Sequence, residues 1–339
     1  MGKIPHRQNT NNLSTKILGD VDNIRYLCTD MSRLIDNIAD FLVENGFELS
    51  FQIRHDFDVI VTRTLDGRHT KVILPLEISA GTIEEAEAES ENAEYAIRMI
   101  TREAGYPLII TEDRWRSQRQ MMEARLLAHL ELFSQAYARN CEVRRIEKAE
   151  AQEFLNRNHS YGDAACKYRY GLFLKRHTGH IAAEMGFPIG SGMTDEVKNL
   201  SEGTLIAVAT FSNARRWVKE GKEIRSYEWT RYASLPDLRV SGGMGKLLKA
   251  FIKEVQPDDI MSYADLEWSE GKVYEKLGFV LEGKKEPVMF QMYDRWRRVP
   301  YRPGMPDEPG EKIAWGMDGE RFFQNLGSNK YRLKLTEYE

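Results

Sequence analysis

The chain has 339 residues, of which 42% are hydrophobic and 29% charged, a size and composition typical of a folded protein with two domains. Its longest strongly apolar run, Leu205–Phe211, is far shorter than the ~20 residues of a membrane helix, and its polar N-terminus lacks a signal-like apolar region, so we expect a cytoplasmic protein without a membrane partner. The net charge is −4, and neither half has the basic excess of a protein that coats nucleic acid without specificity.

Residues 1–20 are polar and show no periodicity, and we expect them to form a disordered arm. Apolar residues at helical spacing then predict a helix over residues 31–41, which ends at Asn45-Gly46. Two strand-like runs follow, at residues 48–62 and 70–78, and a turn signal separates them.

The rest of the N-terminal part is predicted to be helical apart from one short strand. The acidic run at residues 84–94 is typical of a solvated helix face, and residues 107–111 predict a strand. A long helix is expected from residue 112 to about residue 138, with an apolar stripe that packs against a domain. Residues 21–140 are therefore predicted to form a smaller α/β domain with the order α-β-β-α-β-α.

Residues 141–298 alternate more clearly and are predicted to form a second α/β domain. A Gly- and Ser-containing segment, residues 185–203, is typical of a loop that covers a site. Residues 299–339 are predicted to be an extension, with a proline-rich crossing segment and a tail that packs back as a hairpin turning at residues 327–329. Strands are expected at residues 142–147, 168–175, 205–211, 225–233, 260–263 and 288–292, and helices at residues 149–156, 246–255 and 270–277.

The most informative segment, SGGMGK at residues 241–246, joins a predicted strand to an amphipathic helix. Glycines let a backbone approach an anion closely, and the free N–H groups of a helix N-terminus suit phosphate, to which the lysine would add charge. The segment is neither a Walker A loop nor a full dinucleotide fingerprint, and a flexible tight turn explains the same glycines. The candidate cofactor-binding residues are Ser241, Gly242, Gly243, Met244, Gly245 and Lys246.

With these motifs in order, residues 142–293 resemble the GNAT acyltransferases. The glycine turn is similar to the Q/R-x-x-G-x-G/A segment with which that family binds the pyrophosphate of acyl-CoA, although Val240 stands at its first position. YEKLGF at residues 274–279 matches the Tyr-x-x-x-Gly-Phe signature, whose tyrosine protonates the departing CoA thiolate in many members. The resemblance implies a mixed sheet flanked by helices, acetyl-CoA or another acyl-CoA as cofactor, and Tyr274 as general acid.

Four segments, YARNCEVRRI, FLNRNHSYG, SGGMGKLLKAFIKE and MSYADLEWSEGKVYEKLGF, together look like a phage-associated GNAT-like group near the Mom-type DNA-modification proteins. Some members of that group follow an endonuclease domain, and ITEDRW at residues 110–115 resembles the segment that closes it. The resemblance implies that the N-terminal domain is a degenerate nuclease-like or positioning module. It also implies a nucleic-acid partner, DNA before RNA, or another amine acceptor, in the cytoplasm of a bacterium or phage-infected cell.

Metal chemistry has little support in the sequence. Asp58 and Glu77, on successive predicted strands, imitate a D…E-x-K metal site, but Ser79 stands where the lysine is expected. No compact His/Asp/Glu cluster supports a divalent metal, and the three cysteines are an odd number without metal-type spacing. We therefore expect no metal site, no zinc ribbon and no disulfide scaffold.

Acyl transfer to an amine needs a base, an oxyanion donor and an acid for the thiolate. Asp265, after the strand at residues 260–263, is the first candidate for amine binding or for the base, unless it or Ser269 caps the following helix. An imidazole ordinarily titrates near neutrality, so His159 is a candidate for proton transfer, against a structural role. Arg231 and Tyr232, at a strand end, are candidates to align the donor or the acceptor.

Two groups in which arginines stand beside a tryptophan suit phosphate contacts and base stacking. One contains Arg215, Arg216 and Trp217, and the other is RWRR at residues 295–298. A solvated charged face with partly buried tryptophans explains the same pattern.

The sequence therefore predicts a GNAT-type N-acyltransferase that moves an acyl group from acyl-CoA to an amine. If that amine belongs to a nucleobase, the base must be flipped into the pocket. Two alternatives stay open: a GNAT-shaped nucleic-acid-binding module without catalysis, and a metal-dependent endonuclease that uses the N-terminal domain.

Overall fold

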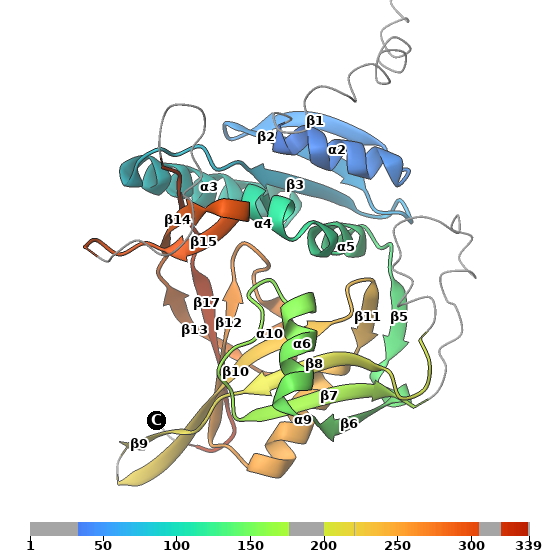
Figure 1. Ribbon diagram of the computed structural model, residues 1–339, viewed down its shortest axis with the longest axis vertical. Helices are drawn as coiled ribbons and strands as arrows, with labels where there is room; N and C mark the ends of the chain where they lie inside the picture. The colour runs from blue at the N-terminus through green and yellow to red at the C-terminus, as the bar shows by residue number, and fades with distance from the viewer. Residues whose placement is uncertain (1–32, 176–199, 220, 305–319, 338–339) are drawn as a thin grey trace, which may run out of the picture.

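The computed structural model describes residues 33–175, 200–219, 221–304 and 320–337, and it confirms the mixed α/β class predicted from the sequence. In Figure 1 an N-terminal unit, with strands β1 to β4, lies above a C-terminal unit built on a larger sheet. The arm expected at residues 1–20 and most of the segment at residues 185–203 lie outside the described residues. Among the helices that the structure describes, none is long and apolar enough to cross a membrane.

The N-terminal unit is built on a sheet with the order β1-β2-β3-β4, in which β4 is parallel to β3 and the other neighbours are antiparallel. The strand predicted as a single run over residues 48–62 is two strands, because His55 and Asp56 both take positive φ values, 49° and 68°, and form a tight turn. The crossover from β3 to β4 is α3 (Ile83–Ala104), which begins with a capping box. The strands are β1 (Leu49–Arg54), β2 (Phe57–Arg63), β3 (Thr70–Leu76) and β4 (Leu108–Thr111).

Helices cover both faces of this sheet. On one face, α2 (Leu34–Glu44) and α5 (Arg119–His129) bury their apolar side chains together with Ile60 and Ile73 of the strands. On the other face, α3 packs on a separate cluster that includes Val59. β3 and β4 read as runs of apolar residues because both faces of the sheet are buried there, whereas the edge strand β1 is mostly exposed.

The helix expected over residues 112–138 is wrong as a single element. It is α4 (Glu112–Ser117), then α5, then the strand β5 (Ser134–Tyr137), and Gln118 breaks the first two apart with φ −130° and ψ 40°. β5 pairs in parallel with β11 (Leu238–Ser241), the short strand directly before the glycine turn. This pairing ties the end of the N-terminal unit to the C-terminal unit.

The C-terminal unit is built on an eight-stranded sheet in which β10 and β12 are parallel and the other neighbours are antiparallel. The strand order is β13-β17-β12-β10-β8-β7-β6, and β9 pairs with the start of β10. The strands are β6 (Cys141–Arg145), β7 (Tyr168–Leu174), β8 (Leu205–Phe211), β9 (Arg215–Lys219), β10 (Lys222–Ser234), β12 (Asp259–Asp265), β13 (Val280–Lys285) and β17 (Ser328–Lys334).

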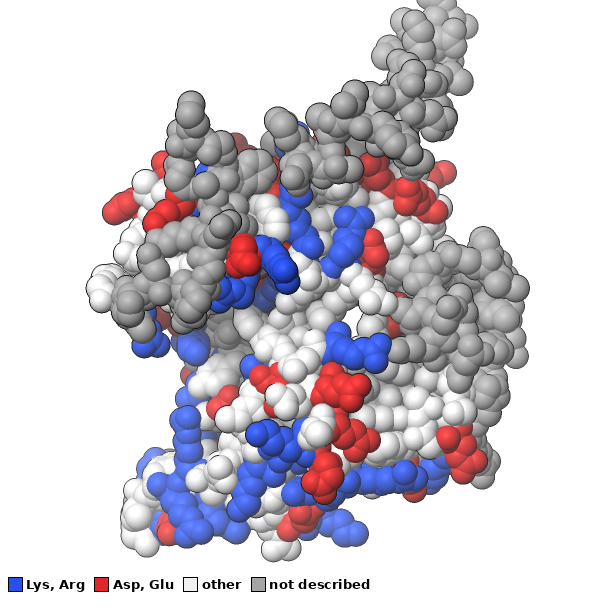
Figure 2. Space-filling model, viewed as in Figure 1, with Lys and Arg blue, Asp and Glu red and all other residues white. Residues whose placement is uncertain are grey.

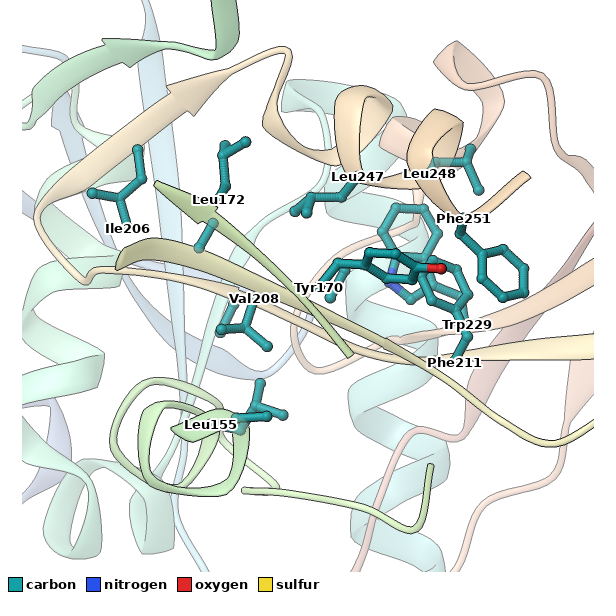
Figure 3. Packing of buried hydrophobic residues seen from close by; sticks show 14 of the residues in the cluster. Leu155, Tyr170, Leu172, Ile206, Val208, Phe211, Trp229, Leu247, Leu248 and Phe251 are labelled. Carbon is teal, nitrogen blue, oxygen red and sulfur yellow. The ribbon is translucent and has the colours of Figure 1, made fainter. Parts of the chain in front are cut away.

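Two helices, α6 (Lys148–Asn158) and α9 (Gly243–Val255), cover opposite faces of this sheet. Figure 3 shows Leu155 of α6 on one side of the strands and Phe251 of α9 on the other. Phe251 is fully buried and stacks on Phe211 of β8, with ring centroids 3.9 Å apart. The amphipathic pattern that predicted α9 is therefore confirmed, and its apolar face anchors the helix that follows the glycine turn.

The C-terminal tail does not form the predicted hairpin. β16 (Phe322–Gln324) pairs with β14 (Met289–Tyr293) in a separate small sheet with β15 (Arg297–Pro300), whereas β17 lies between β12 and β13 in the large sheet. The chain changes sheets at Gly327, which has φ 73° and where a Cβ would lie 2.4 Å from a backbone oxygen of β13. The strand predicted at residues 288–292 therefore packs on α3, pairs with β15 and β16, and does not close the large sheet.

Candidate functional site

The two parallel strands of the large sheet separate part-way along their length. β10 pairs with β12 over three residues that end at Glu228. Beyond that point a bulge at residues 229–231 keeps β10 with β8, while β12 stays paired with β17 as far as Asp265. The facing edges of β10 and β12 form an open wedge, whose backbone N–H and C=O groups can bond an extended ligand.

Tyr274 lies at the closed end of this wedge, on α10 (Lys272–Lys276). Its hydroxyl is hydrogen-bonded at 2.9 Å to the Ser262 hydroxyl of β12, which also lies 3.0 Å from the Trp229 carbonyl of β10. Burial raises the pKa of Tyr274 and the bond to Ser262 offsets only part of this, so the phenol keeps its proton at neutral pH. A protonated hydroxyl is what a general acid requires.

The glycine turn begins α9, but it follows the short strand β11 and not β10 itself. Gly242 is the N-cap, with φ 76°, and a Cβ on Gly243 would lie 2.9 Å from a side-chain atom of Val240. Lys246 does not lie at the mouth of the turn, as was predicted, because its ammonium donates to two backbone carbonyls near the start of β6, at 2.8 and 2.6 Å. The turn therefore offers backbone N–H groups to an anion, without the charge of that lysine.

A cavity of about 1930 Å³ lies between the two units. Its walls come from α4 and α5 of the N-terminal unit, and from β10, α10 and the turns after α6 and β12 of the C-terminal unit. The predicted site residues that line it are His159, Arg215, Arg231, Tyr232, Met244, Asp265 and Tyr274. The predicted residues outside its lining are Arg216, Trp217, Ser241, Gly242, Gly243, Gly245 and Lys246.

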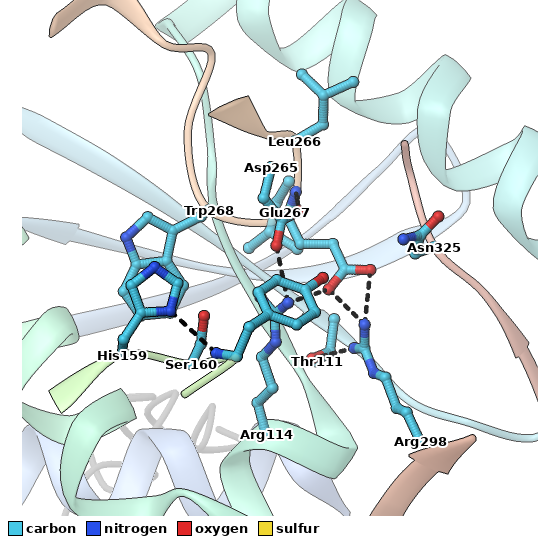
Figure 4. A network of polar contacts seen from close by, with 12 residues as sticks. Thr111, Arg114, His159, Ser160, Asp265, Leu266, Glu267, Trp268, Arg298 and Asn325 are labelled. Atoms are coloured by element: carbon cyan, nitrogen blue, oxygen red, sulfur yellow. Dashed lines mark hydrogen bonds and ion pairs between the residues drawn. The ribbon is translucent and has the colours of Figure 1, made fainter. Parts of the chain in front are cut away.

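Asp265 is part of an ion-pair network that joins the two units (Figure 4). Its carboxylate accepts a hydrogen bond from Arg114 of α4 at 2.8 Å, and Arg114 also lies 3.2 Å from Glu267. Burial raises the pKa of Asp265, but the attraction of Arg114 outweighs burial and the pKa is lowered. Such a carboxylate is a weak base, so the geometry favours a positioning role. The helix-cap alternatives are wrong, because the N-cap of α10 is Gly271.

His159 lines the cavity at the end of α6, where its ring is held neutral. Burial, together with the charges of Arg231 and Arg114, lowers the pKa of His159 to about 3. Its Nδ1 accepts the backbone N–H of Tyr161 at 3.1 Å, which assigns the ring proton to Nε2. His159 is therefore suited to donate a hydrogen bond to a ligand and poorly suited to remove a proton.

In the arginine-tryptophan group at residues 295–298, Trp296 and Arg298 are engaged inside the protein, whereas Arg295 and Arg297 are exposed. Arg298 donates to Asp113 and to Glu267, each at 2.8 Å, and its side chain is buried. The Arg116 guanidinium lies 4.9 Å from the centre of the Trp296 ring. These contacts attach the small sheet to α4, and they leave Arg298 saturated by carboxylates, so the nucleic-acid contact predicted for it is wrong.

The other group lies on an exposed ribbon. Arg215, Arg216 and Trp217 belong to β9, which pairs in antiparallel with the start of β10, and all three are exposed. Figure 2 shows Lys and Arg side chains gathered over this end of the molecule. One of them, Arg216, lies 3.2 Å from Glu223 across the ribbon. The ribbon presents cations and an aromatic ring to solvent, as a nucleic-acid surface does.

The two candidate nuclease carboxylates are held by a guanidinium. Arg33 lies 2.5 Å from Asp58 through Nη2, and 3.9 Å from Glu77 through Nε. Glu77 also accepts the backbone N–H of Leu34, which begins α2. Across the described ranges, no group of three His, Cys, Asp or Glu side chains could hold a metal ion. The pair acts in an ion pair and as a helix cap.

Among the cavity residues that were not predicted from the sequence are Glu228, Tyr161 and Trp268. Glu228 faces the α6 side of the sheet, because its neighbours Tyr227 and Trp229 pack with the aromatic cluster on the α9 side. In the part of the chain that the structure describes, the Glu228 side chain makes no ion pair. The only sequence signal for Glu228 is that side chains of β10 alternate between the two faces of the sheet. Without the register of the strand, this alternation does not show which face lines a cavity.

No family model matches this chain. No curated protein matches it either. Among solved structures it is similar to a GNAT-family acetyltransferase from Bacillus anthracis, with 12% identity over 57% of this chain and 95% of that chain and a TM-score of 0.26. It is also similar to a histone acetyltransferase HPA2 and related acetyltransferase from Corynebacterium glutamicum, with 14% identity, 66% and 82% coverage and a TM-score of 0.26. A third is a mutant AtaT toxin bound to the C-terminus of the antitoxin AtaR and acetyl-CoA, with 11% identity, 55% and 93% coverage and a TM-score of 0.23.

Proposed function

We propose that this chain is an N-acyltransferase of the GNAT type, which moves an acyl group from acyl-CoA, acetyl-CoA first, to an amine. The observation that carries the proposal is the wedge between β10 and β12, closed by the hydroxyl of Tyr274 and open to the cavity between the units. A thioester bound in the wedge would have its sulfur beside a proton donor, which is the arrangement that thiolate departure needs.

The donor would lie on the α9 side of the sheet. The pantetheine arm of CoA carries amides, which match the unpaired strand edges of the wedge. Its pyrophosphate would meet the N–H groups at the start of α9, where the glycines allow close approach. Lys246 would hold the turn in place through its two carbonyl bonds. The residues assigned to the cofactor are Ser241, Gly242, Gly243, Met244 and Gly245.

In the reaction the amine nitrogen attacks the thioester carbonyl carbon, so that a C–N bond forms and the C–S bond breaks. The proton of Tyr274 passes to the departing sulfur, and the tyrosinate then regains a proton from solvent. The proton lost by the amine goes to a carboxylate on the acceptor side, which we assign to Glu228. Asp265 is assigned as a positioning residue through Arg114, and His159 as a hydrogen-bond donor to the acceptor.

The acceptor that we propose is an exocyclic amine of nucleic acid, DNA before RNA, as in the phage-type DNA modification that the sequence resemblance implies. The exposed ribbon with Arg216 and Trp217 supports this choice. Arg215 belongs to the ribbon and also lines the cavity, so a nucleic-acid strand bound along β9 would lead into the cavity. The reacting base would leave its stack to reach the wedge.

A nucleic-acid-binding module without catalysis is the second candidate. Two observations favour it: Val240 replaces the polar residue of the family pattern, and Lys246 is engaged with carbonyls. Both reduce the charge available to a pyrophosphate. The endonuclease alternative lacks such support, because Arg33 occupies the position between Asp58 and Glu77.

The test is to incubate the full chain with acetyl-CoA and single-stranded DNA, duplex DNA, RNA or nucleosides, and to measure acetyl addition by mass spectrometry. We expect transfer by the parent, a rate about 10²–10⁴-fold lower for Tyr274→Phe, and unchanged acetyl-CoA binding by that variant. Tyr95→Phe, on the exposed face of α3, is the matched control. Nucleic-acid binding without acetyl-CoA binding or transfer would overturn the proposal in favour of the binding module.

A further inference from the structure

The cavity has two features that the transfer step itself does not use. Aromatic rings from the turns after α6 and β12 line it, and part of its wall is supplied by the N-terminal unit. We propose that the two units together form a base-binding pocket, in which the planar ring of the acceptor stacks on Tyr161 and Trp268. This inference rests on the proposed function, and it deepens that function by naming the side chains that select the acceptor.

Tyr161 supplies the first ring, from the turn after α6. It is 43% exposed, and it lines the cavity. Both units hold its turn, since Gln118 donates to the Ser160 carbonyl at 2.9 Å and Arg231 of β10 donates to the Gly162 carbonyl at 3.0 Å. An exposed ring on a turn that is fixed in advance loses little conformational freedom when a ligand stacks on it.

Trp268 supplies the second ring, from the turn after β12. Its carbonyl accepts a hydrogen bond from Arg125 of α5 at 2.8 Å, and the Arg125 guanidinium lies 4.3 Å from its ring centre. The Arg114 guanidinium lies 5.0 Å from the centre of the Tyr161 ring and 5.8 Å from that of Trp268. Because two carboxylates neutralise Arg114, it positions both rings and is not available for a phosphate.

Arg231 and His159 supply the polar contacts of the pocket. Arg231 lies 6.0 Å from the centre of the Tyr161 ring, and among the described residues its side chain donates hydrogen bonds to carbonyls only. It forms no ion pair in the part of the chain that the structure describes, so it can bind a phosphate, although the charge of Glu228 also attracts it. The His159 and Tyr161 ring centres are 6.4 Å apart, and Nε2–H of His159 can donate to a ring nitrogen or carbonyl of a base. A nucleotide has both an aromatic ring and a phosphate, whereas an aliphatic amine has neither.

The pocket and the wedge belong to one cavity. Arg231 ends the bulge of β10 that opens the wedge, and the carbonyl of Trp229 at the other side of this bulge bonds Ser262, the partner of Tyr274. A base stacked on Tyr161 would therefore direct its exocyclic amine toward the acyl group.

The test measures binding of a fluorescein-labelled single-stranded DNA oligonucleotide to the full chain by fluorescence anisotropy, without acetyl-CoA. Tyr161→Ala and Trp268→Ala are each expected to weaken binding about 5- to 150-fold, the contribution of one stacked base. Tyr161→Phe keeps the ring and is expected to bind like the parent. Tyr95→Ala removes a tyrosine of similar exposure, 49%, on α3 and is the matched control. Melting temperatures establish that each variant is folded, and Tyr161→Leu replaces Tyr161→Ala if the latter is not.

Loss of binding in the two alanine variants, with binding retained in Tyr161→Phe and Tyr95→Ala, supports the pocket. Unchanged binding in Tyr161→Ala, or no binding by the parent, overturns it even where the parent transfers acetyl groups to another amine. If the parent binds no acetyl-CoA but Tyr161→Ala still loses DNA binding, the proposed function fails and the pocket stands.

Discussion

The guanidinium of Arg114, on α4 of the N-terminal unit, lies 2.8 Å from the carboxylate of Asp265 at the end of β12, one of the two strands that form the wedge. Only 5% of the Arg114 side chain and 18% of the Asp265 side chain are exposed. Arg298 of the small sheet joins the same network through Glu267. Three segments that are far apart in the sequence therefore meet at one buried group of charges, which couples the N-terminal unit to the wedge.

Replacing Arg114 with Met is expected to destabilise the protein by roughly 3–5 kcal/mol, because Asp265 and Glu267 would lose a shared cation in a buried site. Denaturant unfolding of the two proteins measures the difference. The control is Arg216→Met, which removes an exposed cross-strand pair with Glu223 and is expected to cost about 0–1 kcal/mol. Equal losses in the two variants would contradict the coupling described above.

Acid should weaken the same network. Burial raises the pKa of Asp113 and Asp265, but the attraction of Arg298 and Arg114 outweighs it and both pKa values fall below 3.8. A carboxyl whose folded-state pKa is lowered stabilises the fold at pH values above 3.8, and this stability is lost as the pH falls through the lowered pKa. The free energy of unfolding should therefore fall less steeply with decreasing pH for Asp265→Asn than for the parent. Identical slopes of this free energy against pH would refute the prediction.

The pKa of Glu267 is shifted in the opposite direction. Burial raises its pKa above 4.5, and Arg298 and Arg114 offset only part of this. Its contribution to stability is present below pH 4.5 and is lost as the pH rises through the raised pKa. As the pH rises from 4.5, the free energy of unfolding of Glu267→Gln is therefore expected to increase relative to that of the parent. Denaturant unfolding of both proteins at each pH measures this difference. A constant difference across that range would show that Glu267 does not titrate in this way.

Glu77→Ala is expected to cost about 1 kcal/mol, because the backbone N–H of Leu34 loses its acceptor at the start of α2. Glu77→Gln keeps an acceptor oxygen and should be close to the parent in denaturant unfolding. Neither change should alter acyl transfer, since the Glu77 carboxylate does not line the cavity. Divalent-metal-dependent DNA cleavage by the parent that Glu77→Gln abolishes would restore the nuclease reading.

Gly271→Ala is expected to destabilise the protein and to lower the transfer rate. Gly271 has φ 89°, and a Cβ there would lie 2.4 Å from the ring of Tyr331, which stacks on Tyr274 with ring centres 5.3 Å apart. The backbone strain alone costs on the order of 1–3 kcal/mol. Gly283→Ala is the control, because a Cβ at Gly283 meets no atom within 4 Å. If a destabilised Gly271→Ala transferred acyl groups as fast as the parent, the position of the Tyr274 ring would not matter for the reaction.

Elements with strong apolar patterns could be predicted from the sequence, as the apolar run of β8 and the amphipathic α9 show. β9 and β13 could not be predicted, because RRWVK is almost wholly exposed and VLEGKK is exposed along its whole length, so neither alternates. The turn at His55 and Asp56 was missed for a related reason, since it reaches positive φ without the glycine that usually marks such a turn.

Only those site residues that belong to a local sequence motif could be predicted. Tyr274 follows from the YEKLGF signature, and the structure places it at the end of the wedge. Arg114 and Asp265 are 151 residues apart in the chain, so their ion pair depends on how the two units pack. The prediction for Lys246 was wrong because a lysine beside glycines suggests a contact with a bound anion. In the structure its ammonium instead donates to carbonyls at the start of β6 and just before it.

The most direct measurement is a calorimetric titration of the full chain with acetyl-CoA, beside Gly245→Glu and Lys249→Gln. Gly245 belongs to the first turn of α9, and a Cβ there would already lie 3.3 Å from a side-chain atom of Leu277, so a glutamate would obstruct the turn and repel a pyrophosphate. Lys249→Gln lowers the charge of the same helix by one unit away from the turn. Binding by the parent and by Lys249→Gln, but not by a folded Gly245→Glu, is the predicted result. No binding by the parent, or equal binding by all three, would contradict the proposed acyltransferase.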